Sequence, residues 1–435
     1  DGNSTTAVFW RDLARSASDT TAGVVNFGAS DSTRLAINGL IGSYQIIYTI
    51  VDGSGNQVVG TSTVTQNITL GAGPAAAPVI TQGPPTDIGA GVVFTSAPRV
   101  KLQDEFGNDI TTDNVSTVTM SLVTEASSVF TVVKQPGTTT DITPTTVTVI
   151  NGVATFAGTS FVAALASNYK LLFQIDGLST TQSRSASSEF EIKAGAPAVL
   201  VWASGSNLNK PATTYTNNST MISQAGSGGA IQLEIRDAYG NRVTDNSVAT
   251  TITASVKSKS TGGEVTSITG TTATSSSGLA TFSNLVMRAK VADYVLAFTA
   301  SNAGRPINAV SLDSDSISVI PGAAYQLDLT TPAVGAASGA VFATQPVVTV
   351  QDISGNTINT TADIIASVEA VNADGTTAGV TRANATFVGN RTTVAASAGV
   401  ARFDSAITGQ NTSIGLSGTV GHYRVTYNTS LSGLF

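Results

Sequence analysis

The sequence has no cysteine and a single histidine, His422, among its 435 residues. Disulfides are therefore excluded, as are metal sites built from thiolates or from several imidazoles. A Ser-His-Asp triad would have to use His422, which directly precedes Tyr423 in an alternating run, so we interpret it as a solvent-facing strand residue. Nucleophile elbows and phosphate or dinucleotide loops are absent from any strand-turn-helix context. We predict no catalytic residues and no enzymatic activity.

Charge is also scarce. Asp, Glu, Lys and Arg make up 11% of the chain, and the net charge is −7. No stripe of Lys and Arg with interleaved aromatics is present, so we expect no nucleic-acid partner. The polar residues are mainly Ser, Thr, Asn and Gly, a composition typical of secreted material. Low charge weakens the self-repulsion that keeps proteins monomeric, so we expect an extracellular, cell-envelope protein whose partners are copies of itself.

Long apolar runs are missing as well. The longest such stretch, residues 39–51, is interrupted by Ser43, Tyr44 and Gln45. It therefore falls short of the ~20 residues that a membrane-spanning helix needs, and we expect no membrane span. The sequence begins at Asp1 and contains no leader-like segment, so we expect any secretion signal to have been removed or to lie upstream.

The most informative feature that is present is the pentapeptide Asp-x-x-Gly-Asn, followed two residues later by an aliphatic side chain. This turn motif occurs at residues 104–108, 237–241 and 352–356. Asp can cap a turn through its side chain, while Gly and Asn tolerate positive φ, so the motif predicts a tight β-turn. The alternative, Ca²⁺ ligation by Asp104, Asp237 and Asp352, is disfavoured because calcium takes six to eight oxygens. A further copy, residues 52–56, is out of phase and is interpreted as a hairpin turn.

Two more motifs follow each turn motif in the same order. The glycine motif occupies residues 152–156, 278–282 and 399–403, with a weaker relative at 23–27, and ends in Phe each time. The tyrosine motif has an aliphatic residue two positions after the Tyr and an aromatic four positions after it, and begins at Tyr44, Tyr169, Tyr294 and Tyr423. The phenylalanines recur every 121 to 129 residues. Such a period indicates whole domains, because solenoid repeats are only about 20 to 50 residues long.

Strand periodicity surrounds these motifs. Apolar residues lie four and two positions before each motif aspartate, on one face of an extended chain: Val100 and Leu102, Leu233 and Ile235, and Val348 and Val350. Gly, Ala and Pro cluster at residues 71–74, 194–197 and 321–324. We therefore predict a partial unit at 1–71 (the second half of a repeat), domains at 72–194 and 195–321, and a domain at 322–435 that lacks its last strand. The linkers are short, which predicts a rod.

The three motifs in this order resemble the bacterial immunoglobulin-like repeats of the invasin/intimin type, found in large prokaryotic cell-surface and S-layer-like proteins. The segment 344–352, Thr-Gln-Pro-Val-Val-Thr-Val-Gln-Asp, and the run from Gly278 to Phe282 leading into Tyr294 are especially similar. The resemblance covers most of residues 72–435. It implies a β-sandwich of about seven strands per unit and an architectural role without catalytic residues. The predicted fold class is all-β, with tandem immunoglobulin-like β-sandwich domains arranged as a rod.

The leading functional hypothesis is a structural cell-envelope protein whose domains self-associate into a surface layer or an extracellular filament. The ends of the chain suggest strand complementation between subunits, since the last unit lacks a closing strand and the first lacks its opening half. A segment cut from a longer array would show the same ends. The alternative hypothesis is an adhesin stalk or a carbohydrate-binding surface protein, with cell-surface glycans as partners, and a phage tail or decoration protein comes third.

Few other residues are candidates for a binding or modification site. We predict no cofactor; Ca²⁺ between domains is the one ion considered, with Asp109, Asp113, Asp313 and Asp315 as acids that are otherwise solvated loop residues. Trp202 alternates with Leu200 and is predicted to be core, whereas Trp10, in the irregular segment 9–17 where a short helical turn is expected, is the better contact surface. Asn-x-Ser/Thr sequons permit glycosylation without indicating it: Asn3, Asn67, Asn114, Asn217, Asn218, Asn359, Asn384, Asn390, Asn411 and Asn428.

Overall fold

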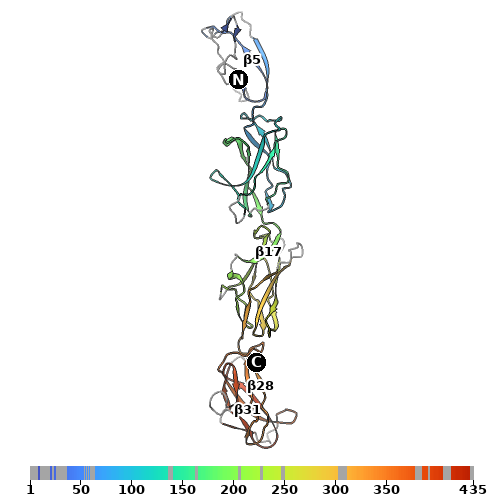
Figure 1. The fold of residues 1–435 in the computed structure, drawn as a ribbon, viewed down its shortest axis with the longest axis vertical. Helices are drawn as coiled ribbons and strands as arrows, with labels where there is room; N and C mark the ends of the chain where they lie inside the picture. The colour runs from blue at the N-terminus through green and yellow to red at the C-terminus, as the bar shows by residue number, and fades with distance from the viewer. Residues whose placement is uncertain are drawn as a thin grey trace. The chain divides into compact units, whose positions relative to one another are not determined.

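The computed structural model describes most of the chain and is built almost wholly of strands and connecting loops (Figure 1). The described residues are 8–9, 20–21, 24–25, 37–52, 54, 56, 58, 64–135, 141–161, 165–203, 207–225, 229–245, 250–301, 311–377, 385–389, 392–404 and 413–431. Contacts divide the chain into two compact units, Asp1–Ala196 with Ala238–Asn241, and Pro197–Asp237 with Arg242–Phe435. Within the described residues, no helix has the length and apolarity needed to span a membrane.

The N-terminal part of the first unit is organised around one long hairpin. Strand β5 (Gly42–Tyr48) pairs antiparallel with β6 (Val64–Leu70), with Tyr44 opposite Ile68. Two short pairs accompany it, β1 (Val8–Phe9) with β4 (Ile37–Asn38) and β2 (Thr20–Thr21) with β3 (Val24–Val25). Phe9 of the expected helical turn is therefore in a strand, while Trp10 and the rest of 10–17 lie outside the described residues.

The remainder of the first unit is a two-sheet domain. One sheet has the order β13 (Val153–Thr155), β9 (Arg99–Gln103), β7 (Ala77–Gln82). The other runs β11 (Val129–Val132), β10 (Thr117–Ala126), β14 (Ser167–Ile175), β16 (Phe190–Lys193), β8 (Asp87–Gly89), with β12 (Thr145–Thr148) and β15 (Arg184–Ala186) at its margins and η2 (Thr181–Ser183) beside them. All pairs in these sheets are antiparallel except β16 with β8.

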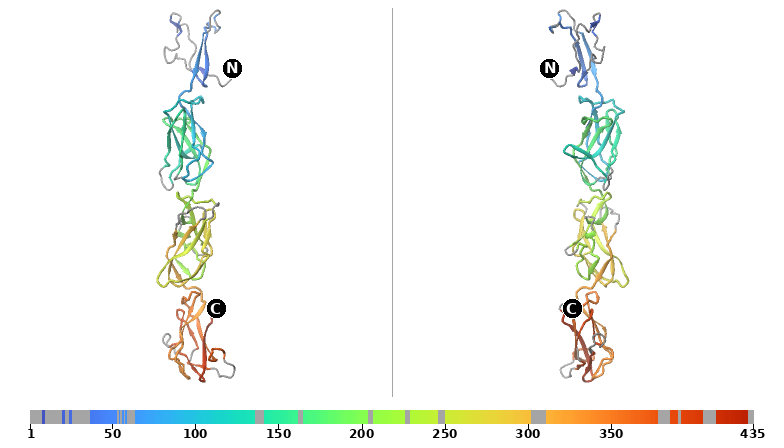
Figure 2. Two further views of the ribbon diagram at one scale, coloured as in Figure 1. Left: turned by 90° about the vertical axis from the view of Figure 1, so that its right-hand side faces the viewer. Right: turned by 60° about the vertical axis from the view of Figure 1, so that its left-hand side comes forward.

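The second unit opens with a domain of the same order. Its first sheet is β17 (Pro197–Trp202), β19 (Ile231–Asp237), β23 (Leu279–Phe282). Its second is β18 (Thr214–Thr216), β27 (Ile317–Ile320), β25 (Asp293–Ser301), β20 (Thr251–Lys259), β22 (Thr272–Thr274), with β26 (Ser311–Asp313) on β25, a separate pair of β21 (Val265–Thr269) and β24 (Val286–Ala289), and η4 (Asn207–Asn209). Two further views show these strands from other sides (Figure 2).

The last domain repeats the first sheet and shortens the second. Its sheets are β28 (Gln326–Thr331), β30 (Val347–Gln351), β34 (Val400–Arg402); β33 (Thr393–Ala395), β31 (Asp363–Val371), β36 (His422–Thr429); and β29 (Ala340–Val341), β35 (Gly415–Ser417), β32 (Thr386–Val388). In the other two domains the tyrosine strand is flanked on one side by β16 or β27. Within the described residues, no strand occupies that side of β36.

The three sequence motifs meet in each core. The apolar pairs before the turn motif are buried, as predicted, and so are the Ala and Phe of the glycine motifs at 152–156, 278–282 and 399–403. The Phe packs against the aromatic residue four positions after the motif Tyr, with ring centroids 5.4 Å apart for Phe156 and Phe173 and 5.3 Å for Phe282 and Phe298. One sheet supplies the first ring and the facing sheet supplies the second. The motifs recur in phase because they are the two halves of one inter-sheet contact.

The tyrosine of each motif forms a hydrogen bond that is typical of immunoglobulin-like folds. Its hydroxyl donates to the carbonyl four residues upstream in all four copies: Tyr44 to Leu40 at 2.6 Å, Tyr169 to Leu165 at 2.9 Å, Tyr294 to Lys290 at 2.8 Å and Tyr423 to Thr419 at 2.7 Å. This is the arrangement of a tyrosine corner. With the strand order of the sheets, it makes the chain an all-β array of tandem immunoglobulin-like β-sandwiches. The rod and the domain boundaries stay predictions.

The first residue of the glycine motif has to be glycine for a steric reason. Gly152 has φ +78°, and a Cβ there would lie 1.4 Å from the carbonyl oxygen of Ile110; Gly399 has φ +82°, and its Cβ would lie 1.9 Å from that of Ile358. Ile110 and Ile358 are the aliphatic residues that follow the turn motif. The glycine motif therefore fixes the segment that leaves each turn.

Candidate functional site

The turn motif has the tight-turn geometry that its sequence predicts. In the first copy, Asp104 Oδ1 accepts hydrogen bonds from the backbone N–H groups of Phe106 and Asn108, both at 2.9 Å. Gly107 has φ +83°, and the corresponding Gly240 and Gly355 have φ +87° and +74°. The side chain of the aspartate thus replaces missing backbone partners, and glycine supplies the left-handed residue.

The second carboxylate oxygen ties the turn to the start of its own domain. Asp104 Oδ2 accepts from Gly73 N at 2.9 Å and from Asn108 Nδ2 at 2.8 Å. Gly73 belongs to the linker that precedes β7. Burial acts to raise the pKa of Asp104, but its hydrogen bonds with Asn108, Gly73 and Phe106 together hold that pKa below the ordinary value of 3.8.

The third copy repeats these contacts in a more buried setting. Asp352 is fully buried, with Oδ1 accepting from Ser354 N at 2.9 Å and Asn356 N at 3.0 Å. Its Oδ2 accepts from Gly322 N and from Asn356 Nδ2, both at 2.9 Å, and Gly322 lies in the linker before β28. Burial again acts to raise the pKa, while the hydrogen bonds with Gly322, Asn356 and Asn217 bring it below 3.8.

In the first copy, the asparagine that ends the motif connects the turn to the preceding segment of the chain. Asn108 Oδ1 accepts from Ile41 N at 2.8 Å, and its Nδ2 donates to Gly39 O at 2.7 Å. These two groups lie three and five residues before Tyr44. One carboxamide therefore satisfies both a carbonyl and an N–H of the same loop, which we call the tyrosine loop.

The same bonds recur at the same spacing in the second unit. Asn356 Oδ1 accepts from Val291 N at 2.8 Å, and its Nδ2 donates to Ala289 O at 2.9 Å. Val291 and Ala289 lie three and five residues before Tyr294. A turn motif bound to the linker of its own domain and to the tyrosine loop of the domain before it is called a joint below.

The middle copy contributes one described bond of this kind within the first unit, to which the segment Ala238–Asn241 belongs. Asn241 Oδ1 accepts from Ala166 N at 2.8 Å, and Ala166 lies three residues before Tyr169. The phenol of Tyr239, the third residue of this copy, lies over Gly91, where an added Cβ would come within 2.3 Å of the Tyr239 hydroxyl oxygen. Glycine at position 91 therefore makes room for this ring.

The third residue of the last motif uses a polar contact instead. Asn217 Nδ2 donates to Ser354 Oγ at 2.9 Å and to Asp352 Oδ2 at 2.8 Å, while Asn217 Oδ1 accepts from Ala289 N at 2.8 Å. Asn217 is buried, so its sequon is not accessible for glycosylation in this structure. The corresponding Phe106 of the first motif is 38% exposed. The joints thus share the Asp and Asn contacts and differ at the third position.

The joint has the chemistry of a structural clamp. The carboxylate oxygens of Asp104 and Asp352 face four and five N–H donors respectively, so neither is placed to take up a proton or to act as a nucleophile. A cation at either carboxylate would have to displace these donors. Within the described residues, no cluster of three or more His, Cys, Asp or Glu is suited to hold a metal ion, and Ca²⁺ binding stays a prediction.

Asp313 and Asp315, which the sequence suggested as calcium ligands, bind different partners. Asp313 pairs with Lys257, and Asp315 accepts from Lys210 Nζ at 3.4 Å. Ser314 between them is buried, and its hydroxyl accepts from Leu296 N at 2.9 Å. The two carboxylates therefore serve different surface ion pairs.

Asp109 and Asp113 also have different hydrogen-bond partners. Asp109 accepts from Lys101 Nζ at 2.9 Å and from Gln103 Nε2 at 2.8 Å. Asp113 caps a turn, accepting from Val115 N and Ser116 N, both at 2.9 Å. The hydrogen bonds with Lys101 and Gln103 lower the pKa of Asp109.

The remaining candidates lie as follows. His422 is exposed on β36, as predicted, and Trp202 is buried against Phe298, with ring centroids 5.4 Å apart and a T-shaped geometry. Trp202 is therefore a core residue, as predicted, and not a platform for a sugar ring. Trp10 lies outside the described residues, as do the sequon asparagines 3, 384, 390 and 411.

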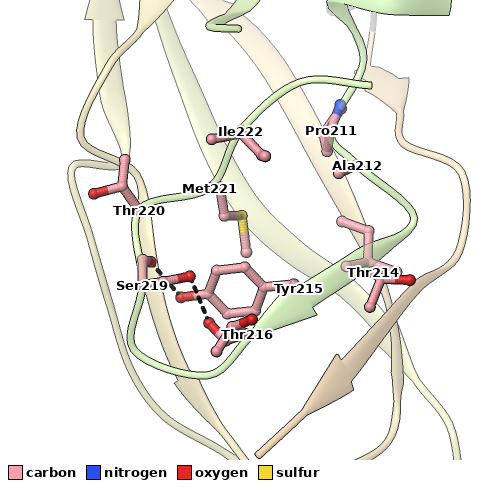
Figure 3. A pocket seen from close by; sticks show the side chains of 10 residues that line it. Pro211, Ala212, Thr214, Tyr215, Thr216, Ser219, Thr220, Met221 and Ile222 are labelled. Carbon is pink, nitrogen blue, oxygen red and sulfur yellow. Dashed lines mark hydrogen bonds between the residues drawn. The ribbon is translucent and has the colours of Figure 1, made fainter. Parts of the chain in front are cut away.

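The cavity drawn in Figure 3 is small and does not contain a reactive group. Its volume is about 100 Å³, and Tyr215 and Met221 lie at its centre. The single proton of the Tyr215 hydroxyl is shared between the carbonyl oxygens of Ser219 and Met287, both at 2.7 Å, and the hydroxyl oxygen accepts from Met287 N at 2.9 Å. These hydrogen bonds hold neighbouring segments together, so the role of the hydroxyl is structural.

Sequence reasoning missed the contribution of the asparagine. A tight turn requires only that its last position tolerate the local backbone, and several residue types do so. Asn nevertheless ends every copy of the motif, including the out-of-phase copy at 52–56. That invariance within one chain was the available signal that the amide contacts something outside the turn.

Comparisons with known proteins give distant similarities. A scan of protein-family models found no match, and a search of curated proteins found none. Invasin, described as a bacterial integrin-binding protein, is 14% identical over 82% of this chain and 57% of its own, with a TM-score of 0.25. A tetra-tandem repeat from the extending region of a large adhesion protein is 13% identical over 84% of this chain and 83% of its own, with a TM-score of 0.24.

A Salmonella alpha-2-macroglobulin mutant is 12% identical over 75% of this chain and 21% of its own, again with a TM-score of 0.24. The similarity to invasin, at 57% of the invasin chain, spans less than two thirds of that protein's length. TM-scores this low do not establish a shared fold, so the fold assignment rests on the strand order and the tyrosine corners.

Proposed function

We propose that this protein is a non-enzymatic structural component of the cell envelope whose immunoglobulin-like domains self-associate into a surface layer or an extracellular filament. The observation that carries the proposal is the joint, which recurs along the chain with the same atoms in the same roles. A chain that repeats one domain and joins a domain to the preceding one through the same specific hydrogen bonds is suited to a load-bearing structural role. With only 11% charged residues, the chain opposes close association only weakly.

Association between subunits uses strand complementation at β36. Unpaired strand edges present rows of N–H and C=O groups that accept a further strand. In the other two domains this side of the tyrosine strand is filled, with Phe190 opposite Tyr169 and Ile317 opposite Tyr294. A strand from a second copy would therefore place an apolar residue opposite Tyr423.

Exposure along β36 supports this assignment. Tyr169 and Tyr294 are buried beneath their closing strands, whereas Tyr423 is only half-buried. The closing strands β16 and β27 both alternate buried and exposed residues, with Phe190 and Ile192 buried in the first. The donor strand needs the same alternation, because a pleated strand presents successive side chains to opposite faces.

Sedimentation velocity and negative-stain microscopy of the purified 435-residue chain test the proposal. We expect concentration-dependent sheets or fibres. A synthetic peptide with the sequence of residues 187–195, which contains β16, should occupy the β36 edge, slow amide exchange along β36 and reduce assembly. A control peptide with Phe190→Asp and Ile192→Asp should do neither. A chain that stays monomeric at all concentrations and salt conditions would contradict the proposal.

A further inference from the structure

Two equivalent β-turns, at residues 89–92 and 216–219, each contact the third residue of a turn motif. In each, the fourth N–H donates to the first carbonyl, at 3.0 Å in the first turn and 3.1 Å in the second. Each turn follows a strand that pairs in parallel with the closing strand of its domain, β8 with β16 and β18 with β27. Both turns therefore occupy the same place in the domain, and we call them the facing turns.

The facing turns share a backbone conformation and differ in their side chains. Their third residues are Gly91 and Asn218, with φ of +78° and +61°, so each turn has a left-handed residue at that position. Their second residues are Ala90 and Asn217, and both are buried. The first facing turn is therefore an Ala-Gly turn and the second an Asn-Asn turn.

The first facing turn holds an aromatic ring. Tyr239, the third residue of the middle turn motif, belongs with the first unit and packs against its hydrophobic core. A Cβ at position 91 would lie 2.3 Å from the Tyr239 hydroxyl oxygen and 2.7 Å from its Cε2. The ring thus fills the space that any side chain at position 91 would need.

The second facing turn holds a serine through hydrogen bonds. Ser354, the third residue of the last turn motif, is only 8% exposed, and its Oγ accepts from Asn217 Nδ2 at 2.9 Å. The other end of the same carboxamide is also fixed, since Asn217 Oδ1 accepts from Ala289 N at 2.8 Å. The space beside this turn is therefore fitted to a small hydroxyl side chain.

Asn218 closes the second facing turn to an aromatic ring. It occupies the position that Gly91 has in the first turn, and its Oδ1 accepts from Arg288 Nε at 2.9 Å. A ring placed over Asn218 as Tyr239 is placed over Gly91 would approach its Cβ to 2.3 Å, far inside the ~3.5 to 4.0 Å of ordinary carbon contacts. The ring would have to move, and the joint would open with it.

The opposite exchange is also unfavourable. Ala90 occupies the position of Asn217 in the first facing turn and has no carboxamide. A serine at position 239 would therefore lack the donor that Asn217 gives to Ser354, and it would leave the space of the Tyr239 ring unfilled.

We propose that the third residue of a turn motif and its facing turn form a matched pair that determines which motif can dock on which domain. The Ala-Gly turn accepts an aromatic third residue, and the Asn-Asn turn accepts a serine. The motif asparagine cannot supply this selectivity, because Asn241 binds Ala166 N and Asn356 binds Val291 N in the same way.

A repeated array needs such selectivity. Its domains are similar enough to dock in the wrong order, and misassembly between domains is a characteristic failure of repeat proteins. Specificity then requires contacts that reject the wrong partner as well as contacts that favour the right one. Asn218 supplies the rejecting contact, and Asn217 supplies the favourable one.

The test uses the full 435-residue chain and the exchange of the Val291 amide, which donates to Asn356 Oδ1 when the last joint is closed. Ser354→Tyr places a ring against Asn218 and should accelerate this exchange at least tenfold. In a chain with Asn217→Ala and Asn218→Gly, which copies the first facing turn, Ser354→Tyr should instead slow the exchange relative to that background. A general loss of stability would not reverse the sign of the effect.

The first unit provides the reciprocal test. Gly91→Asn should accelerate exchange of the Ala166 amide, which donates to Asn241 Oδ1, because the new Cβ meets the Tyr239 ring. Asn is compatible with this backbone conformation, since Asn218 has positive φ in the equivalent turn. In a chain that carries Tyr239→Ser, Gly91→Asn should no longer accelerate the exchange.

Two controls separate the matched pair from general effects. Thr357→Tyr adds the same ring at an exposed position directly after the last turn motif and should leave Val291 exchange unchanged. Amides that pair β20 with β25 should keep their protection in every variant, which shows that the domain stays folded. Both facing turns act within one chain, so these outcomes do not depend on self-association.

Three results would overturn the proposal. One is a Ser354→Tyr chain with wild-type exchange at Val291, or with equal acceleration in both backgrounds. Another is a Gly91→Asn effect on Ala166 that is the same with and without Tyr239→Ser. The third is loss of β20–β25 protection in Ser354→Tyr, because the effect would then not be confined to the joint.

Discussion

Replacement of Asp352 by Ala should open the joint between the last two domains without unfolding either of them. Asp352 accepts five hydrogen bonds, and two of the donors, Gly322 N and Asn217 Nδ2, lie outside its own turn. Hydrogen bonds to a charged acceptor contribute about 1.5 to 3 kcal/mol each, so losing these two costs the joint on the order of 3 kcal/mol. At about 1.4 kcal/mol per tenfold change, the opening equilibrium rises roughly 100-fold.

The exchange of the Val291 amide is the appropriate readout. Val291 N donates to Asn356 Oδ1 and not to the Asp352 carboxylate, so its protection reports whether the joint is closed. We expect hydrogen exchange of this amide to accelerate by about 100-fold in Asp352→Ala. Amides of β25 that pair with β20 should keep their protection, because that sheet contains none of the lost bonds.

Two further variants sharpen the experiment. Asp352→Asn keeps the shape of the side chain but turns an NH₂ group toward Gly322 N, Asn217 Nδ2 or the turn amides, so it should accelerate Val291 exchange at least as much as Ala. Asp374 is an exposed aspartate whose Oδ1 accepts from Thr376 N at 2.9 Å, and Asp374→Ala should leave Val291 exchange unchanged. If Val291 exchange is the same in wild type and Asp352→Ala, the joint does not depend on the buried carboxylate and our account of it is wrong.

The other predictions concern pH, tyrosines and a glycine. The pKa of Asp352 in the folded state lies below 3.8, so the carboxylate stabilises the joint fully above the unfolded-state pKa, and this stabilisation is lost as pH falls through the folded-state pKa. The rate of Val291 exchange, corrected for the intrinsic rate, should therefore not change down to about pH 5 and should rise below about pH 4. Tyr294→Phe loses the corner bond to Lys290 O and should lower the free energy of unfolding by about 1 to 3 kcal/mol. Tyr427→Phe should be neutral or stabilising in the same denaturation assay, since burial raises the pKa of Tyr427 to about 12 and its buried hydroxyl has no partner among the described residues. Gly152→Ala should lower the melting temperature much more than Gly158→Ala. Both glycines have positive φ, but a Cβ at 152 would clash with Ile110 O, whereas a Cβ at 158 meets nothing within 4 Å.

The period and the strand pattern of the sequence were sufficient to predict the fold class. Alternation places Val100 and Leu102 on one face of a strand wherever the chain is extended, and both are buried. The recurrence of Phe156 and Phe282 in phase with the tyrosine motif predicted a repeated domain, and in each domain the Phe ring packs against the motif's last aromatic. These are local or repeated signals, so a single sequence contains them.

The contacts of the joint could not be predicted from such local or repeated signals. The distance along the chain between Asn108 and Ile41 is 67 residues, and between Asn356 and Val291 it is 65. Nothing in the local pattern of either segment shows that they meet. Closeness in sequence was misleading for the loop acids, since Asp313 and Asp315 are only two residues apart but pair with different lysines.

The sequence by itself determined that this protein is an all-β array of repeated domains without thiol or multi-histidine chemistry, because composition, alternation and period are properties of the chain alone. Only the tertiary structure decided what the Asp-x-x-Gly-Asn turns do. Hydrogen-bond partners across two domains depend on where distant loops come together in space, and burial of Asp352 among five donors exists only after that packing has occurred.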